Sequence, residues 1–138
     1  MTNLILKDID GISYMHLNLV NYYSNTSQVE FLANLSKNGF FANKTVYGEK
    51  EDLILLQKAL SKLISDENIA YEYKSMIDEH LSIKFQRNVT GNIAVTCILK
   101  DWDYTSAELK LIFNIDQTIL CEFCVQLEEL FTFIETMI

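Results

Sequence analysis

The chain has 138 residues, of which 49% are hydrophobic and 12% aromatic, and its formal net charge is −8. This length suffices for one domain with a sizeable core, and this composition argues against an intrinsically disordered chain. The negative charge argues against a nucleic-acid-binding protein, because such proteins need a basic face that displaces counterions from phosphates. It suits a basic partner protein, although a solvated acidic surface would explain the same charge.

The opening segment, MTNLILKDIDG, shows no secretory signal, because it lacks a basic start and its apolar run is only about four residues long. No later run approaches the roughly 18 apolar residues that a membrane-spanning helix needs. The three cysteines leave one thiol unpaired in any disulfide scheme, which fits a reducing compartment. We therefore expect a cytoplasmic protein with no membrane segment.

The first half of the chain has the pattern of antiparallel strands. No proline, linker or low-complexity segment divides the sequence, so we predict a single domain over residues 1–138. Apolar and polar residues alternate in a way that predicts strands at 12–23, 28–35 and 40–47. The first two of these strands meet at the turn SNTS.

A helix is predicted next, over residues 49–64. Four leucines recur at spacings of three and four and so share one helix face: Leu53, Leu56, Leu60 and Leu63. Acidic residues open this segment and lysines lie near its end, which is the order that the helix dipole favours. We expect Gly48 to give the backbone the freedom to turn into the helix.

The second half repeats this order. Alternation predicts strands at 80–87, 92–99 and 107–115, with Gly91 in a tight turn between the first two. Residues 71–75 are compatible with a further short strand. The sequence therefore predicts an α+β domain, in which a mostly antiparallel sheet of about six strands carries two helices on one side.

The last helix holds the only C-x-x-C motif, Cys121 and Cys124. Asp116 is a good N-cap for this helix, which then places an apolar stripe on one face: Ile119, Phe123, Leu127, Leu130 and Ile134. The cysteines start about five residues into the helix, beyond the turn where the dipole lowers a thiol pKa. No second spaced pair could complete a zinc site. We interpret both as buried small apolar residues and predict neither metal nor cofactor.

No enzymatic motif is visible in the sequence. There is no G-x-S-x-G, no phosphate-binding loop and no H-E-x-x-H. Asp101 and Asp103 flank Trp102 and could resemble the carboxylate pair of a glycosidase, but a polar surface loop explains them better. We therefore predict that the protein is not an enzyme.

One stretch resembles a known family. The run TGNIAVTCILKDWDYTSAELKLIFNIDQTILCEFCVQLEEL is similar to the second half of the WapI-type immunity proteins of bacterial polymorphic toxin and contact-dependent inhibition systems. The matching positions are Gly91, Ile93, Val95, Leu109, Phe113, Asp116, Gln117, Thr118 and Leu120. These residues belong to turns, core and a helix cap, so they transfer no catalytic group. The resemblance implies an immunity protein that binds one toxin domain and blocks its active site or substrate groove.

The charge distribution independently fits such a role. Residues 100–138 carry eight acids and two bases, so most of the negative charge lies in the last third. A nuclease toxin, for example, is basic where it binds nucleic acid, and this basic surface would be attracted to the acidic last third of the chain. The predicted partner-binding residues are Asp101, Trp102, Asp103, Tyr104, Glu108, Glu122 and Glu129. An adaptor or structural domain that binds another cellular protein, or a small enzyme, remains the alternative.

Overall fold

A computed structural model describes residues 3–65, 69–74, 79–101 and 107–136. Within these residues the elements are β1 (Asn3–Lys7), β2 (Tyr14–Tyr23), β3 (Gln28–Lys37), β4 (Phe40–Glu49), α1 (Lys50–Ile64), β5 (Ala70–Lys74), β6 (Leu81–Arg87), β7 (Ile93–Asp101), β8 (Ala107–Ile115) and α2 (Gln117–Glu135). Each half of the chain is therefore four strands followed by one helix.

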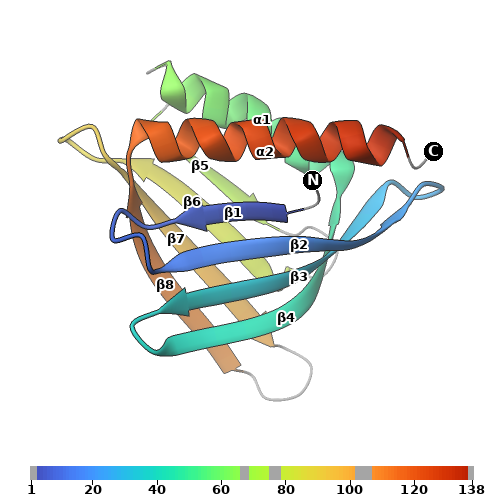
Figure 1. The fold of residues 1–138 in the computed structure, drawn as a ribbon, viewed down its shortest axis with the longest axis horizontal. Coiled ribbons are helices and arrows are strands. Elements are labelled where there is room, and N and C mark those ends of the chain that lie inside the picture. The colour runs from blue at the N-terminus through green and yellow to red at the C-terminus, as the bar shows by residue number, and fades with distance from the viewer. Residues whose placement is uncertain (1–2, 66–68, 75–78, 102–106, 137–138) are drawn as a thin grey trace.

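The strands form two four-stranded antiparallel sheets, in the orders β1-β2-β3-β4 and β5-β6-β7-β8. The sheets face each other and their strands cross at a steep angle (Figure 1). The α+β class and the antiparallel pairing are thus confirmed, but the single sheet of about six strands is wrong. Alternation reveals which face of a strand is buried and does not reveal which strands pair. Residues 71–75 do mark a strand, β5, whereas β1 was missed because its run LIL is short and does not alternate.

The inner faces of both sheets and one face of each helix share one continuous hydrophobic core. Four fully buried phenylalanines anchor it, two from the second sheet, one from the first and one from α2: Phe31, Phe85, Phe113 and Phe123. Between the sheets, the sulfur atoms of Met15 and Cys97 lie 3.8 Å apart. Burial of this apolar surface is the main stabilising contribution to the fold.

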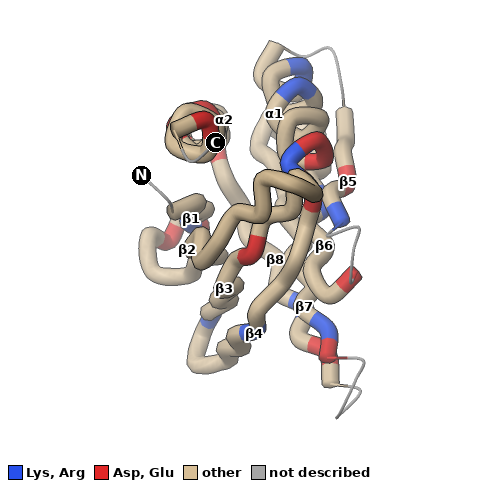
Figure 2. The backbone as a smooth tube through the Cα atoms, turned by 90° about the vertical axis from the view of Figure 1, so that its right-hand side faces the viewer, with Lys and Arg blue, Asp and Glu red and all other residues tan. Residues whose placement is uncertain are grey.

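The two helices lie antiparallel, side by side, on the side of the sandwich where the edge strands β1 and β5 run (Figures 1 and 2). Helix α2 packs against β1 and α1 packs against β5. The side-chain oxygen Oε1 of Gln126 accepts a hydrogen bond from the backbone N–H of Ile5 at 2.7 Å, so α2 satisfies a donor on the edge of β1. The four leucines predicted for the inner face of α1 are all buried.

Gly91 and Gly48 have different structural roles. Gly91 adopts φ +88° in the turn between β6 and β7, as predicted. Gly48 lies inside β4 and does not begin the helix, because the strand continues to Glu49. A Cβ at position 48 would lie 2.7 Å from the hydroxyl oxygen of Tyr73 on β5, so any larger residue here would require the Tyr73 side chain to shift.

Candidate protein-binding surfaces

The predicted loop residues Trp102, Asp103 and Tyr104 lie outside the described residues. The two acids on either side of them are placed at the ends of β7 and β8, and each has a lysine partner. Asp101 Oδ1 lies 3.2 Å from Nζ of Lys44 on β4, and Glu108 Oε1 lies 3.9 Å from Nζ of Lys100. These two acids therefore add little net negative charge to their surroundings.

A groove of about 310 Å³ lies at this end of the molecule. We call it the rim groove; it is lined by Phe41, Ala42, Asn43, Lys44, Leu99, Lys100, Asp101, Ala107, Glu108 and Leu109. Phe41 is 73% exposed and its neighbour Phe40 is 67% exposed. The sequence prediction did not single out these aromatics. Two adjacent phenylalanines after a tight turn are a usable signal, since alternation cannot bury both.

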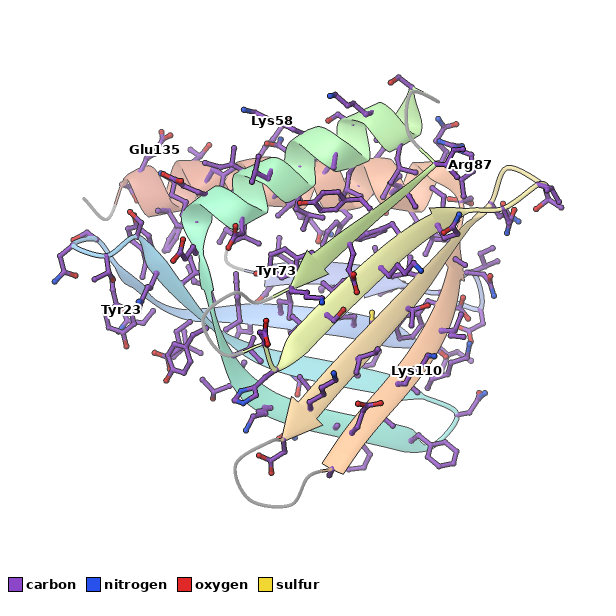
Figure 3. All side chains as sticks on the ribbon, turned by 180° about the vertical axis from the view of Figure 1, so that it is seen from behind. Tyr23, Lys58, Tyr73, Arg87, Lys110 and Glu135 are labelled. Carbon is purple, nitrogen blue, oxygen red and sulfur yellow. The ribbon has the colours of Figure 1, made fainter. Side chains whose placement is uncertain are left out.

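The outer side of α2, unlike the rim groove, is acidic. Four glutamates lie on it, Glu122, Glu128, Glu129 and Glu135, and α2 contains no lysine or arginine. We call this side the acidic helix face. It also exposes Val125 and Phe133, and these residues with Glu128, Glu129, Thr132 and Thr136 line an open depression of about 610 Å³. In Figure 3, Glu135 of α2 and Lys58 of α1 both point away from the sheets.

The predicted partner-binding residues do not form a single surface. Glu122 and Glu129 lie two turns apart on the same flank of α2, Glu129 in the depression and Glu122 beside a groove of about 380 Å³ between α2 and the β1–β2 turn. Asp101 and Glu108 lie at the ends of β7 and β8 that point away from the helices (Figure 1). Gln126, which lies between Glu122 and Glu129 in the sequence, binds the edge of β1 and does not extend the exposed surface.

The C-x-x-C motif has two different environments. Cys124 is buried and Cys121 is exposed, so the expectation that both are buried is wrong for Cys121. Burial, together with the nearby Cys121 and Glu128, raises the pKa of Cys124 to about 11. A thiol with this pKa stays protonated at neutral pH and is a poor nucleophile. Asp116 caps the helix as predicted, since its Oδ1 accepts a hydrogen bond from Ile119 N at 2.9 Å.

Other potentially reactive side chains are kept apart. Cys97 is fully buried between the sheets, and burial raises its pKa well above the ordinary value. His16 belongs to β2 next to the inward-facing Met15, so alternation directs it to the opposite, outer face of the first sheet. Within the ranges that the structure describes, no group of three or more His, Cys, Asp or Glu side chains could hold a metal ion.

No helix among the described residues is both long enough and apolar enough to cross a lipid bilayer. No family model and no curated protein matches this chain. Among solved structures, a chain from the crystal structures of Trypanosoma brucei MRP1/MRP2 is similar, with a TM-score of 0.54 and 8% sequence identity. The match covers 95% of this chain and 83% of that chain. At this identity the likeness concerns the fold alone.

Proposed function

We propose that this chain is a WapI-type immunity protein that binds a basic toxin domain and blocks its active site or substrate groove. The observation that carries the proposal is the acidic helix face. Its four glutamates are not offset by any base on α2, whereas the acids at the rim groove are paired with lysines. Uncompensated charge of one sign attracts a partner of opposite sign and speeds association.

The same face also carries apolar groups that support a stable complex. Val125 and Phe133 are exposed beside Glu128 and Glu129 in the depression on α2. Protein interfaces commonly combine a few apolar or aromatic anchors with a surrounding polar rim. The glutamates would guide the basic surface of the toxin onto α2, and the apolar side chains would then be buried.

Inhibition of this kind requires binding to the toxin and no chemical step. An inhibitor that covers an active site needs no nucleophile or bound metal of its own, and its affinity comes from complementary shape and charge. The exposed glutamates of α2 would occupy the positions that an anionic substrate takes on a basic toxin. The proposal therefore places the partner on α2 and not on the loop between β7 and β8.

The test uses the reading frame immediately upstream of this one, which is the expected source of the toxin. Its C-terminal domain is expressed in cells with and without this chain, and growth is measured. We expect the wild-type chain to restore growth and to form a complex with the toxin domain during gel filtration. The variant Glu122→Lys/Glu129→Lys should fold normally but lose most of the protection, because these two glutamates lie two turns apart on one flank of α2 and both negative charges become positive.

A matched control separates local from overall charge. The variant Glu30→Lys/Glu72→Lys changes the net charge from −8 to −4, as the α2 variant does, since each reversal adds two units. Glu30 and Glu72 lie on strands β3 and β5. This control should protect as well as wild type. Equal protection by both variants would move the interface away from α2. Absence of any complex with the toxin domain would favour an adaptor that binds another protein.

A further inference from the structure

Strand β4 differs from the edge strands β1 and β8, because no hydrogen bond from the described residues reaches the outer edge of its first half. The edge of β1 receives Gln126 of α2. The edge of β8 is met by the β1–β2 turn, where Asn114 N donates to Asp8 Oδ1 at 2.6 Å and Ile9 N donates to the carbonyl of Asn114 at 2.9 Å. The edge strand β5 packs against α1. An open strand edge offers unpaired backbone groups to an additional strand.

The hairpin geometry identifies which groups of β4 point outward. Asn38 and Gly39 form a two-residue turn with φ +52° and +83°, flanked by the paired residues Lys37 and Phe40. In such a hairpin the flanking pair exchanges hydrogen bonds, so the even-numbered residues of β4 bond to β3. The hydrogen bond from Lys50 N to the carbonyl of Ser27, at 2.9 Å, continues this series.

The backbone groups of Phe41, Asn43 and Thr45 therefore point away from β3. No hydrogen bond to these outward groups is present within the described part of the chain. These three residues span about 13 Å of extended backbone, at roughly 3.3 Å per residue. An added strand could pair with each of them.

The rim groove provides a floor for such a strand. Strands β7 and β8 continue past the edge of β4 (Figure 1). The inward-facing side chains of Leu99 and Leu109 line the groove beside Phe41 and Asn43. An added strand would place alternate side chains on this apolar floor and the others in solvent, beside the exposed ring of Phe41.

The charges of the groove indicate what kind of segment fits. An inward-facing lysine on an edge strand ordinarily discourages pairing, but Lys44 is neutralised by Asp101 at 3.2 Å. Lys100 is likewise paired with Glu108. The groove is thus neutral and matches an uncharged segment. Two copies of this chain would each bring a net charge of −8, and their repulsion disfavours self-pairing.

We propose that β4 is a docking edge for an extended, uncharged segment of another protein, which adds as a fifth strand to the first sheet and covers the rim groove. Backbone hydrogen bonds to Phe41, Asn43 and Thr45 would hold it, and alternate apolar side chains would contact Leu99 and Leu109. The inference does not depend on the acidic helix face, which lies at the other end of the molecule.

The probe is a blocked, uncharged peptide of alternating threonine and valine, about seven residues long, which is enough to span the edge. Amide hydrogen exchange of the full chain is followed by NMR with and without the peptide. In the free protein we expect fast exchange at Phe41, Asn43 and Thr45 and slow exchange at Ala42 and Lys44. Peptide should slow the first three at least tenfold and leave the other two unchanged.

Variants at Asn43 test the backbone contact directly. Asn43→Pro removes an outward N–H that β3 does not use, so an edge strand tolerates it, whereas Asn43→Ala keeps that N–H. We expect the proline variant to bind the peptide at least tenfold more weakly and the alanine variant to bind like wild type. If the proline variant has a lowered melting temperature, the test of the proposal is the hydrogen exchange of the wild-type protein with and without the peptide.

Three results would overturn the proposal. The first is no binding of the peptide, and the second is binding that leaves exchange at Phe41, Asn43 and Thr45 unchanged. The third is protection of these amides that rises with protein concentration in the absence of peptide, because a second copy would then be the occupant.

Discussion

The two halves of the molecule, residues 3–64 and 70–135, share one plan of four antiparallel strands followed by a helix. Their helices bury equivalent positions when counted from the N-cap residues Glu49 and Asp116. The buried residues four, seven, eleven and fourteen positions after each cap are Leu53, Leu56, Leu60 and Leu63 in α1 and Leu120, Phe123, Leu127 and Leu130 in α2. Each helix also packs against the first strand of the other half. The core thus follows one repeated pattern.

The surfaces of the two halves do not repeat. Helix α1 carries lysines near its end, including Lys58 and Lys62, whereas α2 carries glutamates and no base. Figure 2 shows this contrast, with basic residues towards the end of α1, acidic residues at its start, and acidic residues alone on α2. The shared positions are those that fold the chain, so the recognition that we propose would depend on the positions that differ.

The largest effect is expected from matched core truncations. Leu60→Ala in α1 and Leu127→Ala in α2 each remove a fully buried side chain at the equivalent helix position. Each should lower the free energy of unfolding by about 2–5 kcal/mol, measured by chemical denaturation. Unchanged stability in either variant would show that this helix does not bury the predicted face.

A smaller effect distinguishes the two helix caps. The Asp116 side chain caps α2 through Ile119 N, whereas Glu49 makes no side-chain hydrogen bond at the start of α1. Asp116→Ala should therefore cost about 1 kcal/mol of unfolding free energy, and Glu49→Ala should cost clearly less. Equal losses in the two variants would contradict this assignment.

The smallest effect concerns the thiols of α2, which have no counterpart in α1. At pH 8 an alkylating reagent should modify Cys121 rapidly and Cys124 slowly, as mass spectrometry can measure. Burial raises the pKa of Cys124 to about 11, so the folded state favours the protonated thiol. The stability that this provides is present below about pH 9, the ordinary pKa, and is lost as the pH rises towards 11. Equal labelling at pH 8 would mean that Cys124 is not buried.

Much of the fold could be predicted because periodicity reports burial. The leucine spacing of α1 and the alternation in β8 led to boundaries within a residue of those observed. Strand pairing could not be predicted, because it depends on contacts distant in sequence. The division into two sheets and the edge position of β4 therefore emerged only from the structure.

The candidate site was predictable only in part. The excess of acids in the last third of the sequence pointed to α2, where Glu122 and Glu129 lie exposed. The pairing of Asp101 with Lys44 joins residues 57 positions apart and left no local signal. The sequence alone therefore could not show that the charge of Asp101 near the end of β7 is compensated by Lys44, whereas α2 has no base to compensate its glutamates.

The central claim is that a basic partner is attracted to α2 and not to the molecule as a whole. The most direct measurement is the association rate with the upstream toxin domain at low and physiological ionic strength, where salt screens exposed charges beyond about 8–10 Å. We predict that Glu122→Lys/Glu129→Lys slows association at least tenfold at low salt and removes most of the salt dependence, while Glu30→Lys/Glu72→Lys retains both. Equal slowing by the two variants would contradict the claim, because the attraction would then follow the net charge alone.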